Sequence, residues 1–509
     1  MIAGDSVIFR VVYRKEKWMK YISTRGSSER IDSSEAIING IAGDRGLYVP
    51  ESIPNLPVEL EELKGMSYKD IAKMVLGVFF TDFSKEQIEH CVNSAYDDKF
   101  SKDDAVGFTK TKEAFFLELY HGKTAAFKDM ALSILPFLLT ESIKMQGSDK
   151  KICILTATSG DTGKAALEGF ADVEGVDIIV FYPNNGVSTV QERQMITQQG
   201  DNTHVFAIEG NFDDAQTAVK DIFTDSEFAK EIGALGYKFS SANSINIGRL
   251  VPQVAYYVYS YAKLLSSGQI KAGDPINVVV PTGNFGNILA GYYAKHMGIP
   301  IAKLICASNE NKVLTDFFET GVYHLDREFY LTSSPSMDIL VSSNLERLLF
   351  NLSGNDGAQI KNLMKSLDEN KRYEVSPEIK KGLSEFYAGF SNSEKGAQNI
   401  KELYDTEHYL MDTHTAVAYS VYKDYKKNTG DDTDTVIVST ASAYKFAESV
   451  AAAIGSLRGK DGFEDLKNLS KHTSTEIPCC LRDLDKRDVI HGDVIKVGEM
   501  RKAILNCLK

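Results

Sequence analysis

Residues 151–183, KICILTATSGDTGKAALEGFADVEGVDIIVFYP, hold two short apolar stretches separated by a glycine-containing turn and an amphipathic stretch. We interpret 151–158 and 176–183 as strands and 163–172 as the helix between them. A strand, a crossover helix and a second strand in this order form a right-handed βαβ unit with parallel strands. The segment therefore predicts a parallel sheet with helices packed against it.

The same alternation of strand and helix patterns continues along the chain. Further strand candidates lie at 203–210, within 275–287, and at 301–308. Region 310–430 is richer in helical patterns and polar turns, and the apolar stretch 435–443 then predicts a buried strand that returns to the sheet. We therefore predict an α/β fold with doubly wound, mostly parallel sheets, and a domain built from segments that are separated in the sequence.

Length and composition set the broad class of protein. A chain of 509 residues is too long for one ordinary core, which indicates two or three domains. The formal net charge of −13 argues against a nucleic-acid partner, and no apolar run is as long as a membrane span. The six cysteines have neither metal-ligand nor redox spacing, so we expect reduced thiols, no metal site and a cytoplasmic protein.

Two glycine loops each join the end of a predicted strand to the start of a helix, where amide N–H groups and the helix dipole favour anions. The first, TSGDTGK (158–164), has too few residues between its glycines for a nucleotide-binding P-loop. Ser159, Asp161 and Thr162 nevertheless supply more polar groups than a plain turn requires. The second, PTGNFGN (281–287), is consistent with either a phosphate-binding loop or a structural turn.

Lys128 stands at the start of the apolar run ALSILPFLL, which predicts a mostly buried helix broken or kinked near Pro136. Burial disfavours the charged form of a lysine and makes its amine a better nucleophile. The alternative is a lysine whose amine reaches back to solvent. A nucleophilic lysine, a phosphate-binding loop and a polar loop are together the parts of a pyridoxal-phosphate site.

Several segments, in chain order, are similar to those of the threonine synthases, pyridoxal-phosphate enzymes of fold type II in the tryptophan synthase β-like family. The resemblance begins at Met19 and covers nearly the whole remaining chain. The segments are MKYISTRG, NGIAGDRGLYVPESIP, HGKTAAFKD, TATSGDTGKAA, QERQM, AIEGNFDDAQ, SSANSINIGR, PTGNFGNILAGYYAK, SPSMDI and DTHTAVA. The resemblance implies a large domain, a small mobile domain and an N-terminal domain, which we place at 271–509, 111–270 and 19–110.

The resemblance also implies residue roles. Lys128 matches the lysine that binds pyridoxal 5'-phosphate covalently and then moves protons, and Thr440 matches a hydroxyl residue that faces the pyridine nitrogen. The residues that match the cofactor phosphate loop are Gly283, Asn284, Phe285, Gly286 and Asn287. Those that match substrate-binding residues are Ser159, Asp161 and Thr162, for the substrate carboxylate and cofactor rim, and Asn243, Ser244 and Arg249, with the arginine on the substrate phosphate.

The implied reaction converts O-phospho-L-homoserine and water to L-threonine and phosphate, as the last step of threonine biosynthesis, in a monomer or homodimer. An alternative with the same early steps is a phospho-lyase that yields 2-oxobutyrate. Residues 1–18 have no counterpart in the resemblance, and one hypothesis is that translation starts at Met19 and that this stretch is a misplaced start.

The chain departs from the family pattern at several positions close to the expected site. Lys123 replaces a proline, which raises the hypothesis that its amine contacts the substrate phosphate. Ile247 and Gly248 replace a Trp-Ala pair, and Thr413 replaces a proline. The segment STASAYKF (439–446) replaces STAHPAKF, so that Ser442, Ala443 and Tyr444 differ near the pyridine. These departures put the shape of the substrate pocket, and hence turnover, in question.

Overall fold

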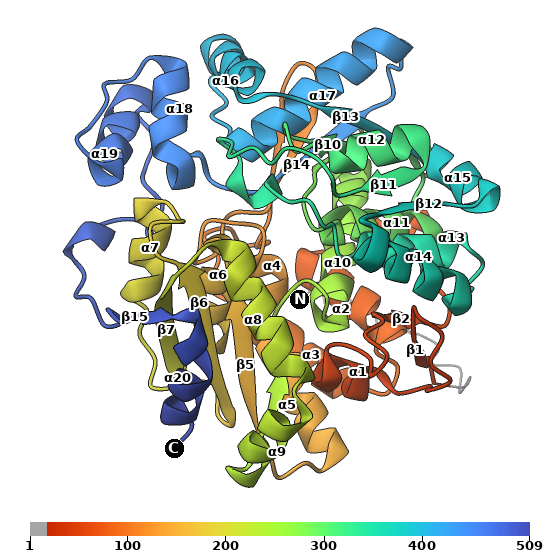
Figure 1. Cartoon of the computed structure of the whole chain (residues 1–509). Helices are drawn as coiled ribbons and strands as arrows, with labels where there is room; N and C mark the ends of the chain where they lie inside the picture. Colours follow the sequence, from red (N-terminus) through yellow and green to blue (C-terminus); the bar gives the residue numbers. More distant parts are fainter. Residues whose placement is uncertain (1–17) are drawn as a thin grey trace, which may run out of the picture.

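The computed structural model describes residues 18–509 (Figure 1). Of the predicted 18-residue extension only Trp18 falls among them, so the expectation about the start of translation lies outside the described residues. Two parallel sheets form the body of the molecule, and the N-terminal segment packs beside them.

The larger sheet has six strands in the order β13-β10-β9-β14-β4-β3. All neighbours are parallel except β3, which runs antiparallel to β4 at one edge. The strands are β13 (Phe386–Phe390), β10 (Ile301–Ser308), β9 (Ile276–Pro281), β14 (Thr435–Ser439), β4 (Phe115–Glu118) and β3 (Gly107–Lys110). β14 lies between β9 and β4, which confirms the predicted late return of the chain to the sheet.

Both faces of the larger sheet are covered because its strands are apolar on both sides. Val278 and Val280 of β9 pack into the cluster that includes α10 (Ile247–Ser266) and α11 (Gly286–His296). Val279 points the other way, into the cluster that includes α17 (Thr413–Thr429). Alternate residues of a strand face opposite sides of a sheet, so three consecutive valines at 278–280 require helices on both faces.

The smaller sheet has five parallel strands in the order β15-β7-β6-β5-β8. They are β15 (Val494–Lys496), β7 (Thr203–Glu209), β6 (Val176–Pro183), β5 (Lys151–Ala157) and β8 (Tyr237–Ser240). The helices of this part are α4 (Asp129–Leu132), α5 (Leu135–Gln146), α6 (Asp161–Phe170), α7 (Thr189–Ile196), α8 (Phe212–Thr224), α9 (Ser226–Ala234) and α20 (Met500–Cys507). The opening sequence thus forms β5, α6 and β6, as predicted.

The remaining elements surround these sheets (Figure 1). The N-terminal part contains β1 (Tyr21–Ser23), α1 (Ser33–Asn39), β2 (Tyr48–Pro50), α2 (Tyr68–Phe79) and α3 (Lys85–Ala95). Beside the larger sheet lie α12 (Val313–Thr320), β11 (Val322–His324), α13 (Leu345–Leu352), α14 (Gly357–Asn370), β12 (Arg372–Glu374), α15 (Pro377–Gly382), α16 (Ser393–Glu407), α18 (Ala447–Ile454) and α19 (Gly462–Thr473). Short 3-10 turns include η2 (Pro335–Met337) and η4 (Ala443–Phe446).

Two further expectations can be compared with the structure. The helix after Lys128 is interrupted between α4 and α5, with Pro136 in the first turn of α5, as predicted. The domain boundaries 110/111 and 270/271 stay a prediction, and each sheet takes strands from both sides of one of them. β4 follows residue 110 but belongs to the larger sheet, while β15, near the C-terminus, belongs to the smaller one.

Candidate active site

Lys128 lies where the two sheets approach each other. The chain leaves β4, forms the loop 119–127 and reaches Lys128 as the residue before α4. This loop pairs with the segment that follows β14: the Phe127 N–H donates to the Thr440 carbonyl at 2.8 Å, and Ala126 and Ala441 form an isolated β-bridge. Thr440, itself buried, is therefore held beside Lys128 although 312 residues separate them in the sequence (440 − 128).

The Lys128 amine is mostly buried and lies between two polar groups. Its Nζ is 3.2 Å from Asp161 Oδ2 and 3.4 Å from Ser336 Oγ, and the side chain is 11% exposed. Burial lowers the pKa of Lys128, and the positive charges of Lys445 and Arg249 lower it further, against the opposing effect of Asp161. The lowered pKa favours the uncharged, nucleophilic form of the amine.

Asp161, in the first turn of α6, connects Lys128 to a second buried lysine. Its Oδ1 is 2.8 Å from Lys445 Nζ and accepts a hydrogen bond of 2.9 Å from Gln191 Nε2. Its Oδ2 faces Lys128 and accepts from the Ser336 hydroxyl at 3.1 Å. Burial alone raises the pKa of a carboxyl, but the charges of Lys128 and Lys445 outweigh it and hold the pKa of Asp161 well below its usual range.

The loop 283–287 presents amide N–H groups at the start of α11. Within residues 18–509, the N–H groups of Gly283 to Asn287 donate no hydrogen bond to protein atoms. The loop is held instead through a carbonyl: that of Asn284 accepts hydrogen bonds from the Asn344 N–H at 3.1 Å and from the Asn344 side-chain amide at 3.0 Å. An anion at this helix start would meet several free donors and the positive end of the helix dipole.

Phe285 and Gly283 show how closely this loop is constrained. Phe285 adopts a left-handed φ of 65°, which is uncommon for a residue other than glycine. Its ring is buried and stacks on Phe318 with a centroid distance of 5.9 Å, which compensates for the strained backbone. At Gly283 a Cβ atom would lie 2.6 Å from the Ser336 carbonyl oxygen, so only glycine lets this loop approach the turn that carries Ser336.

The remaining predicted substrate residues lie at the carboxyl ends of β5 and β8, which are neighbours in the smaller sheet. Ser159 and Thr162 flank Asp161. Their amide N–H groups donate no hydrogen bond within the described chain. Asn243 and Ser244 follow β8 and are half-buried. The Asp161 N–H is also free, so the loop 159–162, whose Asp161 side chain contacts Lys128, forms a second set of free donors, whereas the Asn243 N–H donates to Ser241 Oγ at 3.1 Å.

Arg249, in the first turn of α10, is the buried cation of this region. Its Nη1 donates to the Ala242 carbonyl at 2.6 Å, while its Nε has no hydrogen-bond partner within the described chain. Burial lowers its pKa to about 10, so the guanidinium keeps its charge at neutral pH. A buried arginine with unused donors is suited to binding an anionic group of a ligand.

Comparison with known proteins connects this geometry to a family. The family models that match are "Threonine synthase N terminus" over residues 20–96, "Pyridoxal-phosphate dependent enzyme" over 108–441 and "Threonine synthase, C-terminal" over 415–487. The threonine synthase of Schizosaccharomyces pombe is 35% identical over 470 residues, covering 86% of this chain and 90% of that protein. The chain belongs to the threonine synthase family.

Solved structures agree with this membership in the threonine synthase family. The pyridoxal-phosphate-bound threonine synthase of Brucella melitensis has a TM-score of 0.85 at 34% identity, and the match covers 96% of this chain and 100% of that one. Yeast threonine synthase has a TM-score of 0.84 at 32% identity, with 96% and 98% covered. "Threonine synthase-like 1" of Macaca fascicularis is 41% identical over 436 residues, but the match spans only 58% of its length and 83% of this chain.

The residues of the site fit pyridoxal phosphate, the cofactor of the threonine synthase family. The donor loop 283–287 and its glycine-only contact at Gly283 suit a phosphate group. Lys128 supplies a buried amine of lowered pKa, and the buried hydroxyl residue Thr440 is paired through its backbone with Phe127, the residue before Lys128. Among the described residues, no cluster of three or more His, Cys, Asp or Glu side chains could hold a metal ion.

Several buried polar residues of the site were not predicted from the sequence. Ser336 lies in SPSMDI and Lys445 in STASAYKF, two segments that were compared with the threonine synthases. The residues next to them in the sequence give no indication of a role in the site. His414 Nε2 accepts from the Ser336 N–H at 3.2 Å, and His414 Nδ1 contacts Asp412 Oδ2 at 2.7 Å. This pair fixes the turn that carries Ser336. The only available signal was that all these segments also resemble threonine synthases.

Lys123 forms an ion pair away from the polar groups that contact Lys128 Nζ, which are Asp161 and Ser336. Its Nζ is 3.5 Å from Glu168 Oε1, and Glu168 also pairs with Lys164 at 2.9 Å. These three residues line a hollow of about 1100 Å³ that Lys128 does not line. The lysine side chain is 49% exposed. The structure therefore gives no support to the hypothesis that Lys123 contacts the substrate phosphate.

The other departures from the threonine synthase pattern are accommodated by packing. A Cβ on Gly248 would lie 2.7 Å from Leu135 Cδ1, so a larger residue beside Ile247 would require the Leu135 side chain to shift. The Ser442 N–H donates to the Ala125 carbonyl at 3.0 Å, and the Tyr444 hydroxyl donates to the Thr475 carbonyl at 2.9 Å. The Thr413 hydroxyl is buried without a hydrogen-bond partner in the described chain.

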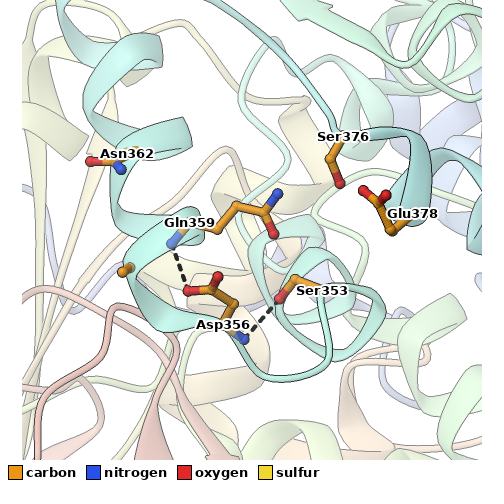
Figure 2. A pocket seen from close by; sticks show the side chains of 7 residues that line it. Ser353, Asp356, Gln359, Asn362, Ser376 and Glu378 are labelled. Atoms are coloured by element: carbon orange, nitrogen blue, oxygen red, sulfur yellow. Dashed lines mark hydrogen bonds between the residues drawn. The ribbon is translucent and has the colours of Figure 1, made fainter.

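Another hollow, of about 520 Å³, lies over α13–α15 (Figure 2). Its lining includes Ser353, Asp356, Gln359, Asn362, Ser376 and Glu378. Asp356 accepts from the Gln359 N–H at 3.0 Å, and the Ser353 hydroxyl accepts from the Asp356 N–H at 3.0 Å. These groups cap the start of α14, which accounts for their polarity without a ligand.

No helix in residues 18–509 is long and apolar enough to cross a membrane.

Proposed function

We propose that this chain is a threonine synthase that converts O-phospho-L-homoserine and water to L-threonine and phosphate, in the cytoplasm, as a monomer or homodimer. The observation that supports it most is the buried Lys128 amine between the carboxylate of Asp161 and the hydroxyl of Ser336, in a chain 35% identical to a threonine synthase over most of both lengths. The reaction is a γ-elimination followed by β-addition of water, which makes the enzyme a carbon–oxygen lyase.

Pyridoxal phosphate, bound by Lys128, supplies an electron sink that stabilises negative charge at the substrate α carbon. The chain contributes the binding and proton transfer. The free N–H groups and hydroxyls of Ser159 and Thr162 suit the substrate carboxylate, since the Asp161 side chain is already paired with two lysines. Asn243, Ser244 and Arg249 suit the substrate phosphate, and the arginine would stabilise charge on the leaving group.

Lys128 is the base in this proposal. Its amine takes a proton from the α carbon and, once that proton has been passed on, one from the β carbon; after phosphate has left, protons return to the γ and α carbons and water adds its hydroxyl at the β carbon. A single amine can serve adjacent carbons only if it is uncharged at the start and held in position, and burial together with Asp161 and Ser336 meets both conditions. The hydroxyl of Thr440, rather than a carboxylate, suits a pyridine nitrogen that stays unprotonated.

The test is product analysis with O-phospho-L-homoserine. The purified enzyme should form threonine and phosphate in equal amounts, and Lys128→Ala should form neither while remaining folded. The departures at Ser442, Ala443 and Tyr444 favour a second candidate, a phospho-lyase that yields 2-oxobutyrate, ammonia and phosphate. Formation of 2-oxobutyrate without threonine would replace the first proposal by the second, and absence of phosphate release would refute both.

A further inference from the structure

Lys445 contacts the same carboxylate as Lys128, that of Asp161. No motif pointed to this residue. It lies in η4, just after β14, and its side chain is fully buried. Its Nζ is 2.8 Å from Asp161 Oδ1 and donates to the Thr124 carbonyl at 2.8 Å. Both contacts have the length of charge-assisted hydrogen bonds. Two such acceptors around a completely buried lysine amine suit its ammonium form.

Lys128 contacts the same carboxylate at a longer distance than Lys445 does. Its two contacts, at 3.2 Å to Asp161 and 3.4 Å to Ser336, are longer than those of Lys445. One carboxylate is shared by two lysines, and Arg249 of α10 adds another positive charge within electrostatic reach of Lys128. In a buried site a surplus of positive charge is costly. The amine with the weaker contacts is the one that gives up its proton.

We propose that Lys445 is a positioning residue that occupies Asp161 as a permanent ammonium and thereby keeps Lys128 in its uncharged, nucleophilic form. The inference rests on the assignment of Lys128 made under Proposed function. It explains why the site contains two lysines. A carboxylate next to Lys128 alone would stabilise the ammonium form and suppress its reactivity, whereas a carboxylate already paired with Lys445 orients the Lys128 amine at a smaller electrostatic penalty.

The surroundings of Lys445 support a fixed charge there. Asp129, at the start of α4, lies within electrostatic reach of Lys445, and burial raises the pKa of Asp129 to about 6 although the Thr124 hydroxyl and N–H donate to it. The titratable and charged groups that act on the two lysines thus include Asp161, Asp129, Arg249 and the thiol of Cys480. The lowered pKa of Lys128 agrees in direction with the geometric argument.

The chemical consequence concerns bond formation with the cofactor aldehyde. The Lys128 nitrogen joins the aldehyde carbon, one water leaves, and no proton needs to be released if the amine is already uncharged. If it is an ammonium, a proton must first pass to solvent, and the rate at neutral pH falls with the uncharged fraction of the amine. Lys445 therefore acts on capture of the cofactor and on each later step in which Lys128 is the base.

The test measures the proton state of Lys128 without turnover. The full-length chain, stripped of cofactor, is labelled with trace acetic anhydride between pH 6 and 10. Peptide mass spectrometry then gives the acetylation rate of Lys128 relative to the half-exposed Lys123, which serves as an internal reference. In Lys445→Gln, which keeps a donor for the Thr124 carbonyl but loses the charge, the relative reactivity of Lys128 at pH 7.5 should fall about tenfold.

The controls separate charge from structural damage. Asp161→Asn should change the reactivity of Lys128 in the opposite direction, because it leaves the positive charges of Lys445 and Arg249 unopposed. Lys445→Arg keeps the charge and should stay within about twofold of the wild type; it supplies the test if Lys445→Gln does not fold. The proposal is overturned if the pH profile of Lys128 acetylation in Lys445→Gln matches that of the wild type. It is also overturned if Lys128 reactivity decreases in both Lys445→Gln and Asp161→Asn.

A separate measurement distinguishes failure of this inference from failure of the proposed function. Borohydride reduction of the holoenzyme followed by peptide mapping identifies the lysine that carries the cofactor. Cofactor on Lys128 with an unchanged profile in Lys445→Gln overturns only the role of Lys445. Cofactor on another lysine overturns the assignment of Lys128 and this inference with it.

Discussion

Gly283→Ala tests whether the contact between loop 283–287 and the Ser336 turn shapes the cofactor site. The added Cβ would lie 2.6 Å from the Ser336 carbonyl oxygen, whereas ordinary contact begins at 3.4 Å. One of the two segments must therefore move by about 0.8 Å, the difference between these distances. The Ser336 hydroxyl is already 3.1 Å from Asp161 and 3.4 Å from Lys128, so a shift of this size would break both contacts.

Overpacking of this kind costs about 1–3 kcal/mol. If the cost falls on cofactor binding, the dissociation constant for pyridoxal phosphate rises roughly 5- to 150-fold, since 1.4 kcal/mol corresponds to a factor of ten. Titration of the stripped enzyme with pyridoxal phosphate, followed by absorbance, measures this change, and urea unfolding of the same sample shows any part of the cost that appears as lost stability.

Gly286→Ala is the matched control in the same loop. A Cβ at Gly286 would have Asn344 Nδ2 as its nearest neighbour, at 3.4 Å, and Gly286 opens α11, where alanine is a better helix former than glycine. Its unfolding free energy should stay within about 1 kcal/mol of the wild type. The reasoning is refuted if Gly283→Ala matches the wild type in both cofactor affinity and stability.

Two further changes test other parts of the description. Lys123→Pro should leave the Michaelis constant for O-phospho-L-homoserine unchanged at low salt, because Lys123 pairs with Glu168 and not with the site; a several-fold increase would reinstate a substrate contact. The pKa of His204 is raised: burial lowers it, but the interactions with Asp177, whose Oδ1 is 3.8 Å from Nε2, and with Cys507 outweigh burial and raise the pKa to about 9. The charged form of His204 therefore stabilises the fold fully below pH 6.5, and this stabilisation is lost as the pH rises to about 9. In urea unfolding, the stability lost in His204→Gln should accordingly be larger at pH 6 than at pH 9.5, and an equal loss at both would contradict the assignment.

The strands and the order of the chain could be predicted from the sequence because they depend on local patterns. In segments such as 151–183, short apolar stretches alternate with stretches of helical periodicity. The first pattern predicts a strand and the second a helix. The break before α5 follows from Pro136 alone. What no local pattern contains is the pairing of β15 with β7, which joins residues almost 300 positions apart and leaves the boundaries between domains hard to read.

The site divides in the same way. The sequence by itself determined that Lys128 stands at the base of a buried helix and that loop 281–287 joins a strand to a helix, because burial and loop chemistry follow from neighbouring residues. Only the tertiary structure decided that Asp161 faces Lys128 on one oxygen and Lys445 on the other, and that Lys123 faces Glu168 instead. The charge state of a buried lysine depends on the groups around it in space. Those around Lys128 come from α6, α10, η2 and η4, which only the packing of the two sheets brings together.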